Sequence, residues 1–196
     1  MNDFTSQFIN DKKFDELHKR LSEDHNLHRS SIPKENLEAI GSIIVAFQSL
    51  EHTIRSFIGI LANISNDQNL VNILTVKSSF KNLISILSAL AIDKNFHMLE
   101  DLKTLLAKLN KAEEIRNQIV HSVWTSGPRV KTSLKNSGIV HQFEKYTSEE
   151  LNQIALTISK LNNSTSALKF SWIMHCQKQG NIPNGVAFVT SETKLK

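Results

Sequence analysis

The chain contains little cysteine, proline and glycine, and each scarcity narrows the kinds of protein it can be. Of its 196 residues, one is cysteine, three are proline and six are glycine. A single cysteine, Cys176, excludes an intramolecular disulfide and fits a reducing compartment. Scarce glycine and proline argue against a turn-rich β architecture, so we expect long helices.

Long apolar runs are also missing. No segment approaches the roughly 18 consecutive apolar residues of a membrane-spanning helix, and the N-terminus has no basic start followed by an apolar run. We therefore expect a soluble, cytoplasmic protein that does not associate with a membrane. The formal net charge is +4, which helps an anionic partner to approach but is well short of a dedicated nucleic-acid coat.

What the chain does have is apolar residues that recur with a period near 3.6, the pattern of amphipathic helices. Helices are predicted at about residues 31–62, 67–74, 79–92, 98–124 and 147–179. The last one begins with a capping-box pattern, Thr147 followed by Glu150. The predicted fold is all-α, an antiparallel bundle of four to five main helices with a β-hairpin inserted before the last helix.

The predicted bundle divides the chain into three parts. Residues 1–31 are polar and form an accessory segment with one short helix, residues 32–180 form the helical domain, and residues 181–196 form a C-terminal tail. Within the last helix, Trp172 is interpreted as a core residue rather than a base-stacking group.

The stretch AEEIRNQIVHSVW, residues 112–124, places an arginine on the apolar arc of its helix. Arg116 points in about the same direction as Ala112 and Ile119, whereas Asn117 and His121 lie on the flank of the arc. A guanidinium keeps its charge, and burying it without a partner costs several kcal/mol. Arg116 is therefore expected to have a partner or a chemical task.

Arginine and histidine together suit the cleavage of a phosphodiester. Imidazole titrates near neutral pH, so His121 can take a proton from a 2′-hydroxyl or give one to the leaving oxygen. The guanidinium of Arg116 matches phosphate oxygens and stabilises the extra charge of the transition state. The pair suits RNA better than DNA, since RNA carries its own nucleophile, and we expect neither a metal nor a cofactor.

A candidate counterion for Arg116 lies on the first long helix. Glu51 is on the edge of the apolar arc of that helix, and we predict that its carboxylate holds Arg116. The alternative is a partly exposed glutamate that pairs with Arg55 four residues later.

The segment after residue 124 has the character of a hairpin, with Gly-Pro at its start, Asn-Ser-Gly in its middle and β-branched residues on both sides. Strands are predicted at roughly residues 129–134 and 139–146. Arg129, Lys131 and Lys135 make the hairpin basic, so it is a candidate RNA-binding flap that contacts phosphates. The alternative is a solvated hairpin that lysine keeps soluble.

The segment RNQIVH, residues 116–121, resembles the R-x4-6-H signature of the HEPN superfamily (higher eukaryotes and prokaryotes nucleotide-binding domain). The asparagine after the arginine is the commonest form of that signature. The resemblance covers roughly residues 32–180. It implies a helical bundle that dimerises so that two motifs meet and, in active members, a metal-independent endoribonuclease that leaves 2′,3′-cyclic phosphate ends.

Such proteins include toxins of toxin–antitoxin pairs and effectors of antiviral defence. The resemblance thus implies a homodimer acting on RNA, with an antitoxin or a defence-system protein as a further partner. Its catalytic residues would be Arg116, His121 and Asn117, supported by Glu51. The alternative is a non-catalytic HEPN-like module that binds RNA, a nucleotide or a partner protein.

Overall fold

The computed structural model describes residues 32–124, 129–135, 138–144 and 146–186. The chain separates into two compact units: a helical unit formed by Lys34–Ser122 and the chain from Tyr146 onward, and a second unit that contains the strands. The described part of the chain is mostly helical and has five helices, as the periodicity predicts. The accessory segment 1–31 and tail residues 187–196 lie outside the described residues.

Capping residues fix where most helices begin. The helices are α3 (Lys34–Leu61), α4 (Gln68–Thr75), α5 (Phe80–Asp93), α6 (Leu99–Val120) and α7 (Ser148–Lys178). The capping box predicted at Thr147 and Glu150 is confirmed, with each side chain accepting a hydrogen bond from the backbone N–H of the other residue. The side chains of Ser79 and Asp67 cap α5 and α4 in the same way, over 3.2 and 2.9 Å. These caps satisfy N–H groups that a helix start leaves unpaired.

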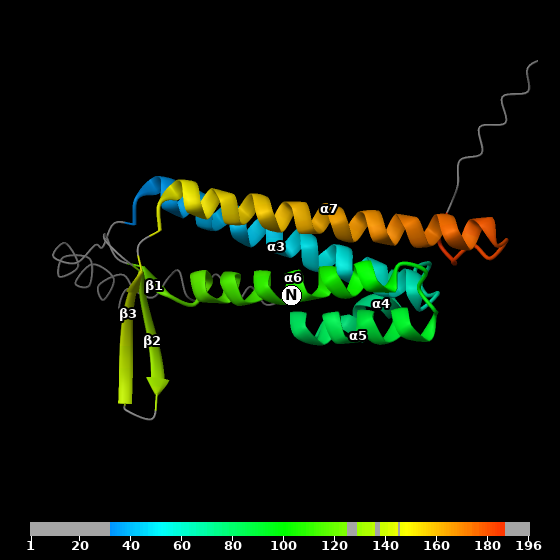
Figure 1. Cartoon of the computed structure of the whole chain (residues 1–196), viewed down its shortest axis with the longest axis horizontal. Coiled ribbons are helices and arrows are strands. Elements are labelled where there is room, and N and C mark those ends of the chain that lie inside the picture. Colours follow the sequence, from blue (N-terminus) through cyan, green and yellow to red (C-terminus); the bar gives the residue numbers. More distant parts are fainter. Residues whose placement is uncertain (1–31, 125–128, 136–137, 145, 187–196) are drawn as a thin grey trace, which may run out of the picture. The chain divides into compact units, whose positions relative to one another are not determined.

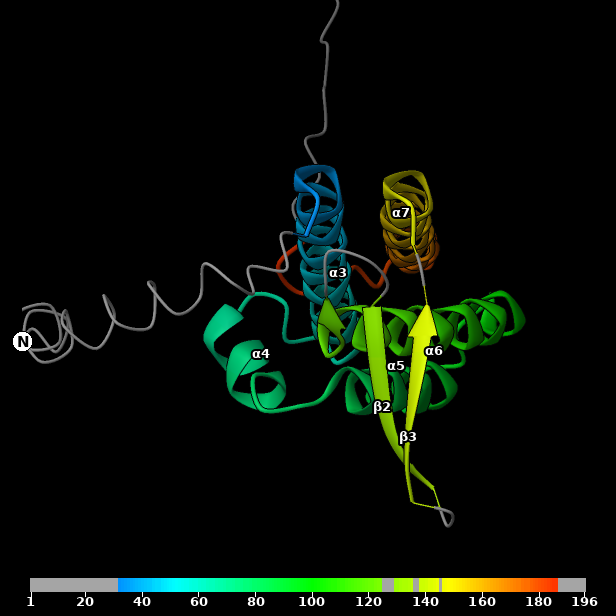
Figure 2. The same cartoon turned by 90° about the vertical axis from the view of Figure 1, so that its left-hand side faces the viewer.

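Helix α3 lies at the centre of the helical unit and contacts each of the other four helices. Figures 1 and 2 show α3 and α7 side by side, with α5 and α6 forming a second layer beside them. The colour order in Figure 1 shows that α3 and α7 run in the same direction and α6 in the opposite one. The longest helix pair is therefore parallel, whereas the predicted bundle is antiparallel, because α4 and its connections return the chain before α5 begins.

The core of the helical unit is the meeting of apolar stripes from these helices. Its largest fully buried side chains come from α3, α5, α6 and α7: Phe47, Phe57, Ile43, Leu50, Ile54, Leu83, Leu87, Leu102, Leu109, Ile119 and Leu151. Burying apolar area of this kind is the main favourable contribution to folding. In the described part of the chain no single helix is long and apolar enough to cross a membrane.

Helix α6 ends at Val120, so the prediction of a helix through residue 124 is wrong at its last turn. Residues Val123–Trp124 form strand β1 instead. The hydroxyl of Ser122 donates a hydrogen bond to the backbone oxygen of Gln118 and so satisfies one of the last carbonyls of the helix. The motif histidine, His121, is thereby the residue at which the helix stops.

The second unit contains a sheet in the order β1-β2-β3, with β2 at Arg129–Lys135 and β3 at Gly138–Glu144. Both pairings are antiparallel. Val123 pairs with Val130, and Arg129 pairs with Glu144. In this register the three basic residues of β2 each face a residue of β3: Arg129 faces Glu144, Lys131 faces Gln142 and Lys135 faces Gly138.

Candidate functional site

Arg116 is half-buried on α6 and contacts α3. Its guanidinium carbon lies 4.6 Å from the centroid of the Phe47 ring. Phe47 is itself buried and packs on Phe80 of α5, with ring centroids 4.5 Å apart. A guanidinium over an aromatic face is attracted by the quadrupole of the ring. The charged end of Arg116 therefore lies against the aromatic part of the core, as its place on the apolar arc predicts.

The neighbouring residue of the motif holds the same guanidinium. Nη1 of Arg116 donates a hydrogen bond to Oδ1 of Asn117 over 2.7 Å. No ion pair of the described residues includes Arg116. Its positive charge is thus oriented by an amide and a ring but is not neutralised by a carboxylate, and a guanidinium has further N–H donors to offer.

Glu51 does not hold Arg116, so the predicted pair is wrong, and the alternative, a pair with Arg55, is the one that the structure has. Its carboxylate pairs with Arg55, one turn further along α3, and both side chains are about three-quarters or more buried, with exposed fractions of 26% and 18%. Nη1 of Arg55 also donates to the backbone oxygen of Thr75 at the end of α4. The local spacing i, i+4 brings the two charges together at little entropic cost, and it leaves Glu51 a structural residue that helps to anchor α4.

His121 follows the last residue of α6, with φ −95° and ψ 9°. Its backbone N–H donates to the oxygen of Asn117 over 3.0 Å, which completes the last turn of the helix. The side chain is exposed, and its ring makes no hydrogen bond with another described residue. The imidazole is consequently accessible to a substrate, but no group within the described chain orients it.

Strand β2 contains the three predicted RNA-binding residues, Arg129, Lys131 and Lys135, which are two and four positions apart. They belong to the second unit, whereas Arg116 and His121 belong to the helical unit. Their side chains lie outside the described structure, so their contribution to an RNA site stays a prediction.

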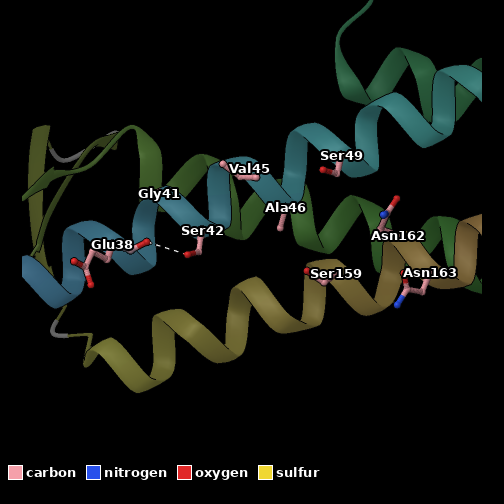
Figure 3. Close-up of a pocket in the computed structure, with 9 residues that line it drawn as sticks. All are labelled: Glu38, Gly41, Ser42, Val45, Ala46, Ser49, Ser159, Asn162 and Asn163. Atoms are coloured by element: carbon pink, nitrogen blue, oxygen red, sulfur yellow. Dashed lines mark hydrogen bonds between the residues drawn. The ribbon is translucent and has the colours of Figure 1, made fainter.

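A groove of about 690 Å³ runs between α3 and α7 (Figure 3). Small and polar side chains line it, among them Ser42, Ser159 and Asn162. Among the described residues that line it, one is charged: Glu38, whose backbone oxygen accepts a hydrogen bond from Ser42 over 3.0 Å. A carboxylate repels phosphate, so this groove is poorly suited to RNA, and the motif remains the better candidate.

The chemistry that this site offers is a positive charge with unused N–H donors on α6 and, five residues further along, an accessible imidazole at the end of the helix. Sequence reasoning missed Phe47, because only the packing of α3 on α6 reveals which of the ten phenylalanines meets Arg116. Among the described residues, no three His, Cys, Asp or Glu side chains gather to hold a metal ion. Comparisons of the chain with protein-family models, with curated proteins and with solved structures found no match.

Proposed function

We propose that the protein is a metal-independent endoribonuclease in which Arg116 and His121 act on the scissile phosphate and Asn117 orients Arg116. The observation that carries the proposal is the guanidinium of Arg116, which is half-buried and has no carboxylate partner among the described residues. Keeping such a charge partly out of water costs free energy. A function that needs an anion at this place explains the cost.

The reaction follows from the two side chains. The imidazole of His121 takes the proton of a 2′-hydroxyl, and the 2′-oxygen attacks the neighbouring phosphorus. The bond from phosphorus to the 5′-oxygen breaks, and the leaving oxygen receives a proton. Arg116 donates hydrogen bonds to the phosphate oxygens as their charge increases. The products are a 2′,3′-cyclic phosphate and a 5′-hydroxyl.

The same proposal includes a homodimer with the HEPN-type bundle. Its support is the R-N-x-x-x-H spacing together with the exposed ring of His121, which no described residue of its own chain orients. A second copy of the motif would supply the missing partner and the second proton-transfer group. In this arrangement the basic strand β2 guides the RNA backbone, and a toxin–antitoxin or antiviral defence setting is the proposed context.

A second candidate is a non-catalytic module that binds RNA, a nucleotide or a partner protein through Arg116. One observation favours it: a general base normally needs a group that fixes its orientation, and the imidazole of His121 has none within the described chain. In that case Arg116 contributes to binding affinity, and His121 has no part in a reaction.

The deciding experiment is RNA cleavage by the purified wild type and His121→Ala in excess EDTA, with the product ends mapped. His52→Ala is the matched control, since His52 is also an exposed histidine but lies on α3. We expect cleavage with cyclic phosphate ends by the wild type and the control, and none by His121→Ala. Equal cleavage by His121→Ala would refute the catalytic role, and RNA binding without cleavage by any of the three would favour the binding module.

A further inference from the structure

A second site lies at the other end of the helical unit. A cavity of about 210 Å³ is formed where the end of α3, the turn before α6 and the end of α7 meet. Its lining is Ile60, Leu61, Asn63, Lys94, Trp172, Cys176, Asn181 and Pro183. The aliphatic, cysteine and proline members are buried, whereas the lysine and both asparagines are exposed. The cavity thus has an apolar floor, one aromatic wall and a polar rim, the usual make-up of a small-molecule site.

The aromatic wall is held rigidly. Trp172 is half-buried and packs on Phe96, with ring centroids 5.4 Å apart, and on His175, at 5.6 Å. His175 stacks on His97, with centroids 4.3 Å apart and planes within 3° of each other. His97 is fixed in turn by a 3.0 Å hydrogen bond between its Nε2 and the hydroxyl of Ser171. An indole fixed by several ring neighbours in this way loses little freedom when a further ring stacks on it.

The loop that closes the cavity is attached to the turn after α3. The backbone N–H of Asn184 donates to Oδ1 of Asn63 over 2.7 Å, and its backbone oxygen accepts a hydrogen bond from Ser65. Gly185 has φ +79°, and a Cβ there would lie 2.6 Å from the backbone nitrogen of Asn66. Only glycine fits such an approach. The described part of the predicted tail is therefore a wall of the cavity.

The rim carries one carboxamide with no hydrogen-bond partner among the described residues and one ammonium group. The carboxamide of Asn181, which offers both a donor and an acceptor, makes no hydrogen bond with another described residue. The ammonium of Lys94 pairs with Asp93 over 3.0 Å, with exposed fractions of 45% and 66%. An exposed pair of this kind contributes little stability, so a phosphate can replace the carboxylate.

From this arrangement we propose that the cavity binds one unpaired purine nucleotide, because a carboxamide matches the donor–acceptor edge of adenine. The base stacks on Trp172, the Asn181 carboxamide hydrogen-bonds its edge, and Lys94 binds the phosphate. Aromatic stacking and a nearby cation are the general means of holding unpaired nucleotides. A cavity smaller than drug-sized sites admits the base while ribose and phosphate stay at the rim.

This site is separate from the motif. Lys94 precedes α6 and Arg116 lies near its end, and at 1.5 Å per residue the helix puts roughly 25 Å between them. The nucleotide is either free or part of an RNA strand, because both present the same base and phosphate. In the second case the cavity is an anchor for a single strand that reaches well away from the place of cleavage.

The test uses the full chain in a Trp124→Phe background, where the indole N–H signal of Trp172 is the only one in a nitrogen-edited NMR spectrum. AMP and a 2′-O-methyl oligoadenylate, which has no free 2′-hydroxyl to attack, are titrated separately, with ribose 5-phosphate as the control ligand. Asn181→Ala and Lys94→Ala are exposed substitutions that leave the core intact. Asn163→Ala and Lys108→Ala are their matched controls, because both residues are exposed and lie outside this cavity.

We expect the Trp172 signal to move saturably with AMP or with the oligoadenylate, but not with ribose 5-phosphate. Asn181→Ala and Lys94→Ala should each weaken binding by roughly 5-fold or more, the effect of removing one hydrogen bond or ion contact, and their controls should not. A shift with both ligands identifies a free-nucleotide site, and a shift with the oligoadenylate alone identifies an RNA anchor. An unmoved signal, or equal binding by all four variants, would overturn the proposal, and neither result depends on cleavage.

Discussion

Replacing Arg116 by methionine separates a functional arginine from a structural one. The change removes a cation–π contact of about 1 kcal/mol and a hydrogen bond to Asn117 of about 1.5 kcal/mol. In return the half-buried charge is gone, no carboxylate is left unpaired, and the thioether packs on Phe47 with a gain of about 1 kcal/mol. We expect the free energy of unfolding to fall by only about 1 kcal/mol or less.

Arg55→Met is the matched control, because Arg55 is an equally long side chain that serves the fold. Its removal leaves the carboxylate of Glu51 and the backbone oxygen of Thr75 without their partner, in a place where both charged side chains are mostly buried. Losses of this type cost about 2–4 kcal/mol. Arg55→Met should therefore be the less stable variant by roughly 2 kcal/mol.

The assay is urea unfolding followed by circular dichroism, with the midpoints compared at a common slope, and RNA cleavage or binding measured on the same preparations. We expect Arg116→Met to keep its stability and lose its action on RNA. Arg55→Met should lose stability but, at urea concentrations below its unfolding midpoint, should keep its action on RNA. If Arg116→Met were as unstable as Arg55→Met, Arg116 would be a structural residue, and the proposed function would lose its main support.

Two further predictions concern the nucleotide cavity. Gly185→Ala should lower the free energy of unfolding by at least about 2 kcal/mol, since its Cβ meets the backbone of Asn66 at a positive φ. Gly180→Ala is the control: with φ +73° and open space around it, it should cost only about 1 kcal/mol. Equal losses of stability in thermal denaturation would contradict the close approach. Burial, and then the neighbouring His175, lower the pKa of His97 from its usual 6.5. The unfolded chain therefore binds this proton more readily than the folded one. The free energy of unfolding should decrease as pH falls below about 6.5 and should level off below the folded pKa. His97→Gln should reduce that slope in urea unfolding at several pH values, and an unchanged slope would contradict it.

Features determined by local sequence were predictable. The Thr147–Glu150 capping box, the helical character of the chain and the inward placement of Arg116 depend on residues within one or two turns of one another. The end of α6 was harder to predict, because residues 121–124 continue the apolar pattern while the chain itself leaves the helix. Whether β-branched residues extend a helix or begin a strand depends on pairing with distant residues.

Contacts between distant segments were not predictable in the same way. For Arg116 the pattern requires a partner but does not name one. The predicted partner, Glu51, forms its ion pair with Arg55, which lies one turn away on the same helix. The partner is an aromatic ring, which carries no charge to suggest it. The helical pattern makes Trp172 a core residue, yet Trp172 is half-buried and lines a cavity together with Asn181 and Pro183 of the loop 181–186.

The parallel pairing of α3 with α7 has a consequence for synthesis on the ribosome. Helix α3 is the hub of the helical unit, but its longest neighbour is the last of the described helices along the chain, and 86 residues separate Leu61 from Ser148. At about 5–20 residues per second, α3 waits for roughly 4–17 seconds with one apolar face uncovered. During that interval the nascent chain is a natural client for chaperones, and a slow codon late in the message would prolong its exposure to aggregation.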